Sequence, residues 1–219
     1  MDGLQSWWSY VVGHSDDVFE ATLEHAQITV TVVILATVFS VALGIYVQSR
    51  PTSKAIALAI SGIFLTIPAL ALFALFIPLV GPGNSPAMMA LFLYAILPIL
   101  RNTVTGLDEV SPAVVESARG MGMSPAQQLW RVRLPLAWPL IMTGVRISTL
   151  LTVGIAAIAI LVGGGGLGVF IQGGLTRLGL PNSVESVWVG TVFTVVLGLA
   201  LDAVLSLIQR LTSSRGLRA

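Results

Sequence analysis

The chain has 219 residues, of which 55% are hydrophobic and only 10% are charged. Its mean hydropathy is +0.92, whereas about a quarter of the residues in a soluble domain are charged. This composition excludes a soluble globular protein and predicts an integral membrane protein. The absence of cysteine excludes disulfides, thiolate metal sites and a cysteine nucleophile. The two histidines, His14 and His25, are expected at the membrane interface, and the residues around them predict no metal site.

Five apolar stretches are each long enough to cross a bilayer as a helix, because a crossing needs about 20 residues. The uncharged run from Ala55 to Leu100 is too long for one crossing, and the turn-forming segment 81–86 divides it. Asn182 and Glu185 have the spacing of a capping box and predict where the last helix begins. The predicted fold is an all-α, polytopic membrane helical bundle. Its spans, in chain order, are Ile28–Val47, Ile56–Val80 with a bend at Pro68, Ala87–Leu107, Pro139–Val162 and Val184–Gln209.

The distribution of charge predicts the orientation of these spans. Residues 1–26 contain five acidic residues and no Lys or Arg. With an external amino terminus and a cytoplasmic carboxyl terminus, ten of the eleven basic residues lie on or near the cytoplasmic side, and only Arg177 lies outside. This arrangement follows the positive-inside rule. We therefore expect an acidic extracytoplasmic segment at 1–26, a transmembrane domain at 27–210 and a cytoplasmic tail at 211–219.

The segment 108–138 between the third and fourth spans has helix signals of its own. Ser111-Pro112 and Ser124-Pro125 each place a capping hydroxyl before a proline, and Gln127 completes a capping box with Ser124. Two helices this short cannot bury a core by themselves, so we expect them to pack on the membrane domain, on another protein, or on lipid headgroups. The predicted helices cover 112–119 and 125–133, are joined by 120–123, and stop at Leu134-Pro135.

The glycine-rich run 163–168 fits the pattern G-x-G-x-x-G of dinucleotide-binding loops. Such a loop follows a strand, and here an apolar helix precedes it, so dinucleotide binding is not expected. Two interpretations remain open: a flexible outer turn, or a close-packed outer gate or docking surface for an extracellular protein. The second would use the close backbone approach that Gly164, Gly165, Gly166 and Gly168 allow.

Arg146 and Asp202 are the charges furthest inside the predicted spans. Each lies seven residues from the predicted cytoplasmic end of its span, about 10 Å deep at the helical rise. Unpaired charges at this depth are costly, so the equal depths predict an ion pair near an inner gate. The alternative is that each side chain faces a water-filled cavity independently. Arg101, near the inner end of the third span, is expected to snorkel to the inner surface.

Segment 108–138 also has a specific spacing: Glu116-Ser117-Ala118, three residues, Gly122, nine residues, then Val132-Arg133-Leu134-Pro135. This spacing resembles the EAA signature of permease subunits of binding-protein-dependent ABC importers, with Ser117 and Val132 as conservative departures. Other motifs resemble the osmoprotectant branch of that family, whose members import glycine betaine, choline, carnitine or proline. They lie at 66–73, 97–103, 120–122 and 164–168, and the resemblance covers about residues 22–210.

The resemblance implies a division of labour. Segment 108–138 would seat a coupling helix in a cytoplasmic ABC ATPase dimer. Glu116 would anchor that helix together with Ser117 and Ala118, Gly122 would permit its turn, and Val132, Leu134 and Pro135 would set its exit. The partner would use ATP and Mg, because this chain lacks the G-x-x-x-x-G-K-[ST] sequence, and we expect it to bind no cofactor.

Further partners are implied by the same resemblance. An extracytoplasmic solute-binding protein would deliver the solute, and a second permease, either a copy or a paralogue, would complete the pathway. The chain would be a multi-pass protein in the cell membrane of a prokaryote. Candidate residues lining the pathway are Thr66, Pro68, Asn102 and Thr103.

Three other functions are alternatives to an osmoprotectant importer permease. A permease for methionine or another small solute would share the loop signature. A non-transporting membrane sensor or scaffold could use segment 108–138 merely to recruit a partner. A membrane enzyme would need a nucleophile with a base, or a metal constellation, and the sequence presents neither. No nucleic-acid partner is expected.

Overall fold

A computed structural model describes residues 3–213, which are almost entirely helical and contain no strand within that range. The all-α prediction is confirmed. A π-helical turn at Leu129–Arg133 and a 3-10 turn at Ala159–Val162 lie at the two ends of α8. The α-helices are α1 (Gly3–Gly13), α2 (Ser15–Val47), α3 (Pro51–Thr66), α4 (Ala69–Val80), α5 (Asn84–Asp108), α6 (Pro112–Gly120), α7 (Pro125–Gln128), α8 (Leu134–Ala156), α9 (Gly168–Leu175) and α10 (Ser183–Thr212).

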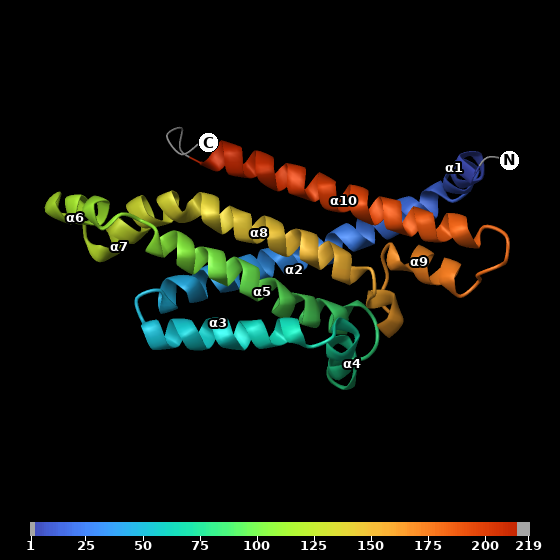
Figure 1. Ribbon diagram of the computed structural model, residues 1–219, viewed down its shortest axis with the longest axis horizontal. Coiled ribbons are helices and arrows are strands. Elements are labelled where there is room, and N and C mark those ends of the chain that lie inside the picture. The colour runs from blue at the N-terminus through green and yellow to red at the C-terminus, as the bar shows by residue number, and fades with distance from the viewer. Residues whose placement is uncertain (1–2, 214–219) are drawn as a thin grey trace.

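The helices form an elongated bundle whose main segments run along its long axis (Figure 1). Four of them, α2, α5, α10 and the continuous helix 125–156, are long and apolar enough to span a membrane. The pair α3 and α4 forms a fifth, bent candidate. The predicted bundle of about five spans is thus confirmed. Helices α6 and α7 lie at one end of the bundle, and α1, α4 and α9 lie toward the other (Figure 1).

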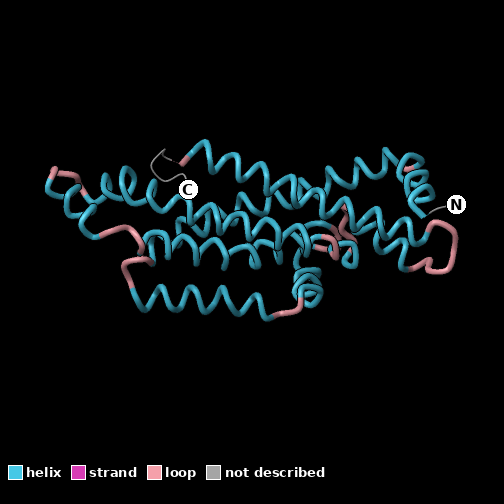
Figure 2. The backbone as a smooth tube through the Cα atoms, turned by 45° about the horizontal axis from the view of Figure 1, so that its top comes forward, coloured by secondary structure: helices cyan, strands magenta, loops and turns pink. Residues whose placement is uncertain are grey.

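The second span is broken rather than bent. Helices α3 and α4 meet at 99°, so that α4 lies across the end of α3 (Figure 2). Ile67 and Pro68 at the break are extended, with ψ angles of 131° and 134°. The residue before a proline is disfavoured in the helical conformation, which explains why α3 ends here. The expectation of one helix bent at Pro68 over Ile56–Val80 is therefore wrong as to the single helix, although the change of direction does occur at Pro68.

The first span lies within a longer helix than expected. Helix α2 has 33 residues, about 50 Å at the helical rise, whereas the hydrocarbon core of a bilayer is about 30 Å thick. It begins at Ser15, so the expected boundary at residue 26 falls inside a continuous helix. Residues 15–26 therefore extend the first span beyond its apolar part, and α1 precedes them.

The expected helix stop at Leu134-Pro135 is also wrong, because a continuous helix runs from Pro125 to Ala156. A proline lacks the N–H that an α-helix needs at that position. Here the backbone widens into a π-helical turn just before it, in which Leu134 N–H donates to Leu129 O. Pro135 then occupies the first turn of α8, where a missing N–H is tolerated. The second short helix thus passes directly into the fourth span.

The capping box predicted at Asn182 is not formed. Asn182 lies in the left-handed region, with φ 64°, and its side chain makes no capping hydrogen bond to α10. An N-cap side chain normally bonds the first turn from an extended backbone. Helix α10 nevertheless starts at Ser183, next to the predicted position, with Glu185 in its first turn.

The core lies where α5 packs against α2 and α8, and it includes the buried residues Val32, Ala36, Leu91, Ile99 and Val145. Gly144 of α8 packs directly against the backbone of α5. A Cβ at this position would lie 2.7 Å from Pro98 O and 2.8 Å from Asn102 Cβ. Both neighbours belong to a helix that cannot move independently of the core, so only glycine fits here.

We expect Gly144→Val to prevent α5 and α8 from packing, at a cost of at least about 1–3 kcal/mol, which is typical of overpacking. The measurements are the yield of monodisperse protein in size-exclusion chromatography and its thermal unfolding midpoint in detergent. Gly154→Val in the same helix is the control, because a Cβ there meets no atom within 4 Å. Equal yields and midpoints for the two variants would contradict this account of the packing.

Candidate functional site

Helices α6 and α7 form a small helical hairpin (residues 112–128) at one end of the bundle. Its second helix starts with a complete capping box: Gln127 N–H donates to Ser124 Oγ at 3.3 Å, and Ser124 N–H donates to Gln127 Oε1 at 2.8 Å. Gly122 adopts φ +82°, a left-handed conformation that closes the turn between the helices and favours glycine. The capping box and the left-handed link are thus present where the sequence places them.

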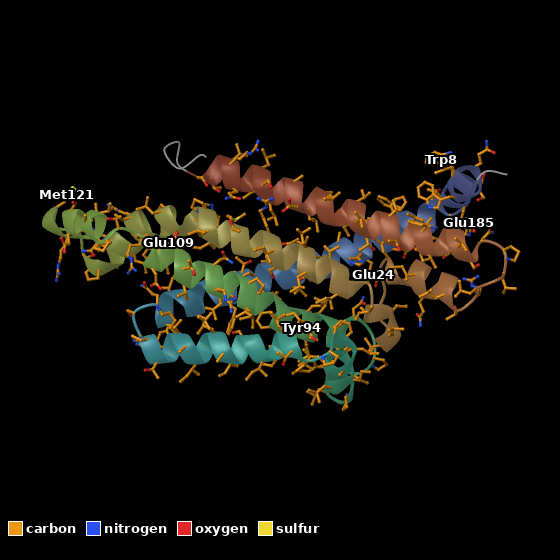
Figure 3. The ribbon with its side chains drawn as sticks, viewed as in Figure 1. Trp8, Glu24, Tyr94, Glu109, Met121 and Glu185 are labelled. Atoms are coloured by element: carbon orange, nitrogen blue, oxygen red, sulfur yellow. The ribbon has the colours of Figure 1, made fainter. Side chains whose placement is uncertain are left out.

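The hairpin presents mostly exposed side chains. Glu116 and Ser117 on α6 are exposed, whereas the neighbouring Ala118 is buried. Met121 at the turn is 71% exposed and forms the tip of the molecule (Figure 3). Exposed apolar residues on a projecting element are typical of a surface that meets a partner. The exit residues Val132 and Leu134 are half-buried and Pro135 is exposed.

Arg133 connects the hairpin to the membrane helices. Its Nη2 donates to Leu107 O at 3.1 Å near the end of α5, and to Gln48 Oε1 just after α2. Lys54 of α3 and Asp108 of α5 form an ion pair at 2.8 Å at the same end. The ends of three membrane helices and the helix leaving the hairpin are thereby tied together. Sequence reasoning missed Gln48, because nothing local indicates that it lies beside Arg133.

Arg146 and Asp202 are brought together between α8 and α10. Arg146 Nε donates to Asp202 Oδ1 at 2.7 Å, and Nη2 donates to Asp202 Oδ2 at 2.8 Å. This is the two-pronged geometry in which guanidinium and carboxylate groups bind most strongly. The side chains are 36% and 23% exposed in the isolated chain. The pair thus joins two spans and remains partly accessible.

The glycine loop (Gly163–Gly168) lies at the opposite end of the bundle and is held by side chains from two other helices. Gly165 N–H donates to Asn84 Oδ1 at 2.8 Å, and Gly166 N–H donates to Glu24 Oε2 at 2.9 Å. Asn84 Nδ2 in turn donates to Glu24 Oε1 at 2.7 Å. The loop is therefore tied to α2 and to the first turn of α5. Sequence reasoning missed Glu24 and Asn84, which looked like a span boundary and a turn residue.

His25 lies beneath the same loop and is packed inside the chain, with 1% of its surface exposed. Leu167 N–H donates to its Nδ1 at 3.3 Å, so Nε2 carries the ring proton and donates to Val153 O at 3.0 Å. The ring thereby connects the glycine loop to the last turn of α8. His14 is half-buried and stacks on Tyr10, with ring centroids 4.1 Å apart.

Close packing explains the glycines of this loop. A Cβ on Gly165 would collide with the Glu24 carboxylate, and one on Gly168 would collide with the carbonyl group of Ala157. A Cβ on Gly164 would lie 2.9 Å from both Ala159 O and Asn84 Oδ1. Gly166 adopts φ +85° above His25. Of the two open interpretations, these contacts favour the close-packed loop over a flexible turn.

The four candidate pathway residues do not form one cluster. Thr66 and Pro68 are exposed at the break between α3 and α4, which Tyr94 of α5 contacts by donating to Ile67 O at 2.6 Å (Figure 3). Asn102 and Thr103 lie two turns further along α5. Asn102 is half-buried, and Thr103 is fully buried against α2.

A cavity of about 440 Å³ lies beside the glycine loop, where parts of α1, α2, α9 and α10 meet. Its lining includes the carboxylates of Asp17, Glu20 and Glu24, with Arg177 as a basic group. Glu24 can therefore be reached from this cavity. Within residues 3–213, no group of three His, Asp or Glu side chains is arranged to hold a metal ion.

A comparison with protein families finds one match that covers most of the chain. The family described as binding-protein-dependent transport system inner membrane component matches residues 29–214. The chain belongs to this family. It is therefore a component of a transport system and a protein of the inner membrane. The chain is thus a permease of this family.

Several characterised relatives match the permease along nearly their whole lengths. The choline transport system permease protein OpuBB of Bacillus subtilis is 42% identical over 197 residues, which cover 90% of this chain and 89% of the relative. The glycine betaine/carnitine/choline transport system permease protein OpuCB of the same organism is 37% identical and covers 98% and 97%. The osmoprotectant import permease protein OsmW of Salmonella typhimurium is 33% identical and covers 95% and 98%.

Solved structures of ABC transporters have the same fold. A chain of the MetNI methionine ABC transporter, in inward-facing conformations, superposes with a TM-score of 0.76, at 25% identity over 90% of this chain and 96% of that one. A chain of an amino acid ABC transporter crystallised with histidines superposes with a TM-score of 0.70 at 20% identity, covering 92% and 96%. The helical architecture is therefore that of ABC transporter membrane subunits.

Proposed function

We propose that the permease is the membrane subunit of an ATP-driven importer for a compatible solute such as glycine betaine, choline, carnitine or proline. The observation that carries this proposal is the 42% identity to a choline permease over 90% of the chain. Relatives whose names include carnitine, glycine betaine or osmoprotectant align over a similar extent. A methionine permease is the less favoured alternative, because the methionine transporter chain is only 25% identical.

In this proposal the helical hairpin docks on a cytoplasmic ABC ATPase dimer, which supplies the ATP and Mg chemistry. The hairpin fits that task because it projects from the bundle, exposes Glu116 and Met121, and is tied to α2 and α5 through Arg133. Ser117, Ala118 and Gly122 shape the docking helix and its turn. Val132, Leu134 and Pro135 carry the movement into α8, because helix 125–156 is continuous. The permease itself carries no ATPase site and is no enzyme.

The remaining parts of the assembly follow from the same proposal. The glycine loop, with Gly164, Gly165, Gly166 and Gly168, forms the outer gate on the side where a solute-binding protein docks. The pair Arg146 and Asp202 lies near the inner gate, and Thr66, Pro68, Asn102 and Thr103 contribute to the pathway. A second permease, a copy or a paralogue, completes the pathway. The amino terminus is outside, with an acidic segment at 1–26, and residues 211–219 form a cytoplasmic tail.

Uptake by the complex tests this function directly. The permease is tagged, isolated with its bound subunits and reconstituted in liposomes together with its solute-binding protein, and uptake of betaine, choline, carnitine, proline and methionine is measured with and without ATP. We expect ATP-dependent uptake of at least one of the first four and none of methionine. Uptake of methionine alone would overturn the solute assignment. Binding of an ATPase without uptake of any solute would favour the sensor or scaffold function.

A further inference from the structure

The hydrogen bonds around Gly165 and Gly166 form a closed ring. The Glu24 carboxylate accepts one bond from Asn84 Nδ2 and one from Gly166 N–H, and Asn84 Oδ1 accepts the bond from Gly165 N–H. The chain between Gly165 and Gly166 completes the ring. Each of its three hydrogen bonds is 2.7–2.9 Å long, which is the normal length of a well-formed hydrogen bond. Loss of any one of them opens the ring.

The ring joins three parts of the chain that are distant in sequence. Glu24 and Gly166 are 142 residues apart, and Asn84 and Gly165 are 81 residues apart. Glu24 belongs to α2, Asn84 begins α5, and the glycine loop follows the end of α8. Figure 3 shows Glu24 toward the end of the bundle that carries α9. This set of contacts therefore joins α2, the start of α5 and the loop that follows α8.

The hydrogen bonds that Glu24 accepts can break and re-form, because they are not part of an ion pair. Glu24 makes neither of the two side-chain ion pairs found within residues 3–213, and its recorded donors are all neutral. The carboxylate is held by the partial positive charges of one backbone N–H, that of Gly166, and of the Asn84 side-chain amide. Glu24 also lines the adjacent cavity, through which water can approach this residue and replace those donors. The ring is thus a reversible closure, in contrast to the apolar packing of the core.

We infer that Glu24 and Asn84 are positioning residues that latch the glycine loop closed, and that this latch opens when the outer gate opens. The inference rests on the proposed outer-gate role of the loop and names the groups that control it. Val162 lies directly before the loop, is 5% exposed, and has its carbonyl bonded to Gly83 N–H at 2.9 Å. Its side chain packs in the apolar core beside the loop, so we expect it to become accessible only when the loop moves away from the bundle.

Thiol accessibility tests the latch without any transport. The chain has no cysteine, so Val162→Cys introduces a single thiol, whose reaction with a water-soluble maleimide is timed in the full-length permease in nanodiscs. We expect Glu24→Ala and Asn84→Ala each to raise the labelling rate at least fivefold, and Glu24→Gln, which replaces one acceptor oxygen, to raise it less. Unchanged rates in the alanine variants, at normal yield and monodispersity, would overturn the inference.

A glycine substitution separates the latch from a general loosening of the fold. Gly165→Ala should raise the labelling rate, because its Cβ collides with the Glu24 carboxylate. In a Glu24→Ala background the obstacle is gone, so adding Gly165→Ala should cause no further increase. Gly173→Ala is the matched control, since its Cβ meets only the end of the Arg177 side chain, at 3.3 Å. If the effects of Gly165→Ala and Glu24→Ala on the labelling rate were fully additive in the double variant, that result would contradict the latch.

The test distinguishes failure of the latch from failure of the proposed function. Labelling is measured on the permease alone, with no solute, ATPase or binding protein present. If the latch variants label faster but the complex transports none of the solutes, the latch is retained and the importer function is rejected. Unchanged labelling of the latch variants, together with import of betaine by the complex, would reject the latch and retain the importer. If Glu24→Ala yields no folded protein, Asn84→Ala and Glu24→Gln supply the same comparison.

Discussion

Replacing Asp202 by alanine is expected to reduce uptake at least tenfold and to destabilise the permease. The substitution leaves the Arg146 guanidinium without the carboxylate that now accepts two of its hydrogen bonds. An unpaired arginine at the centre of a span costs about 2.5–3.5 kcal/mol. Because both side chains are partly accessible, we expect a smaller cost than this, about 2 kcal/mol. Thermal unfolding in detergent and uptake in liposomes measure the two effects.

The charge swap provides the decisive control for this pair. Arg146→Asp combined with Asp202→Arg restores opposite charges across the contact between α8 and α10. We expect it to recover much of the stability lost in either single variant, because the Coulomb attraction is regained even where the geometry differs. Arg101→Ala, which removes an exposed arginine of α5, should change stability little. A double variant no more stable than the sum of the single losses would show that the pair contributes no coupling energy.

Reversing the charge of Glu116 is expected to uncouple ATP hydrolysis from uptake. Glu116 is exposed on α6 in the helical hairpin, so Glu116→Lys should leave folding and membrane level unchanged. If the hairpin docks on the ATPase, a lysine there faces a partner surface that is suited to a carboxylate, and like-charge contacts at an interface cost several kcal/mol. We expect uptake to fall at least tenfold and ATP hydrolysis to lose its stimulation by the binding protein.

Glu109→Lys is the matched control for the hairpin variant. Glu109 is also exposed and belongs to the same segment, but it lies just after α5 and outside the hairpin (Figure 3). The two variants change net charge equally, so a general electrostatic effect on the ATPase would appear in both. Normal uptake by Glu116→Lys at normal membrane levels would contradict the docking role.

Local patterns in the sequence were sufficient for much of the fold. Long apolar runs can be satisfied in a bilayer only as helices, so the spans follow from composition and spacing. The capping box at Ser124 and the left-handed Gly122 are likewise local, since each involves neighbouring residues and a single turn. The match of residues 29–214 to the transport family supports what the loop spacing had indicated.

Local patterns misled where tertiary packing changed the outcome. A proline was expected to stop the helix at Leu134-Pro135, yet a π-helical turn accommodates it and the helix continues to Ala156. At Pro68 the opposite occurred, and an expected bend became a 99° break. Asn182 had the spacing of a cap but lies in the left-handed region. A proline or a cap residue limits the backbone conformations available at its position, and packing against the neighbouring helices determines which of them is adopted.

The sequence by itself determined that this protein is a helical membrane bundle with a short two-helix hairpin, and it singled out Arg146 and Asp202 as candidates for pairing. Only the tertiary structure decided which groups meet at the ends of the bundle: Gln48 with Arg133, and Glu24 and Asn84 with the glycine loop. These contacts join residues 60 to 142 positions apart. Helical periodicity and turn chemistry relate residues a few positions apart, so they carry no information about such contacts.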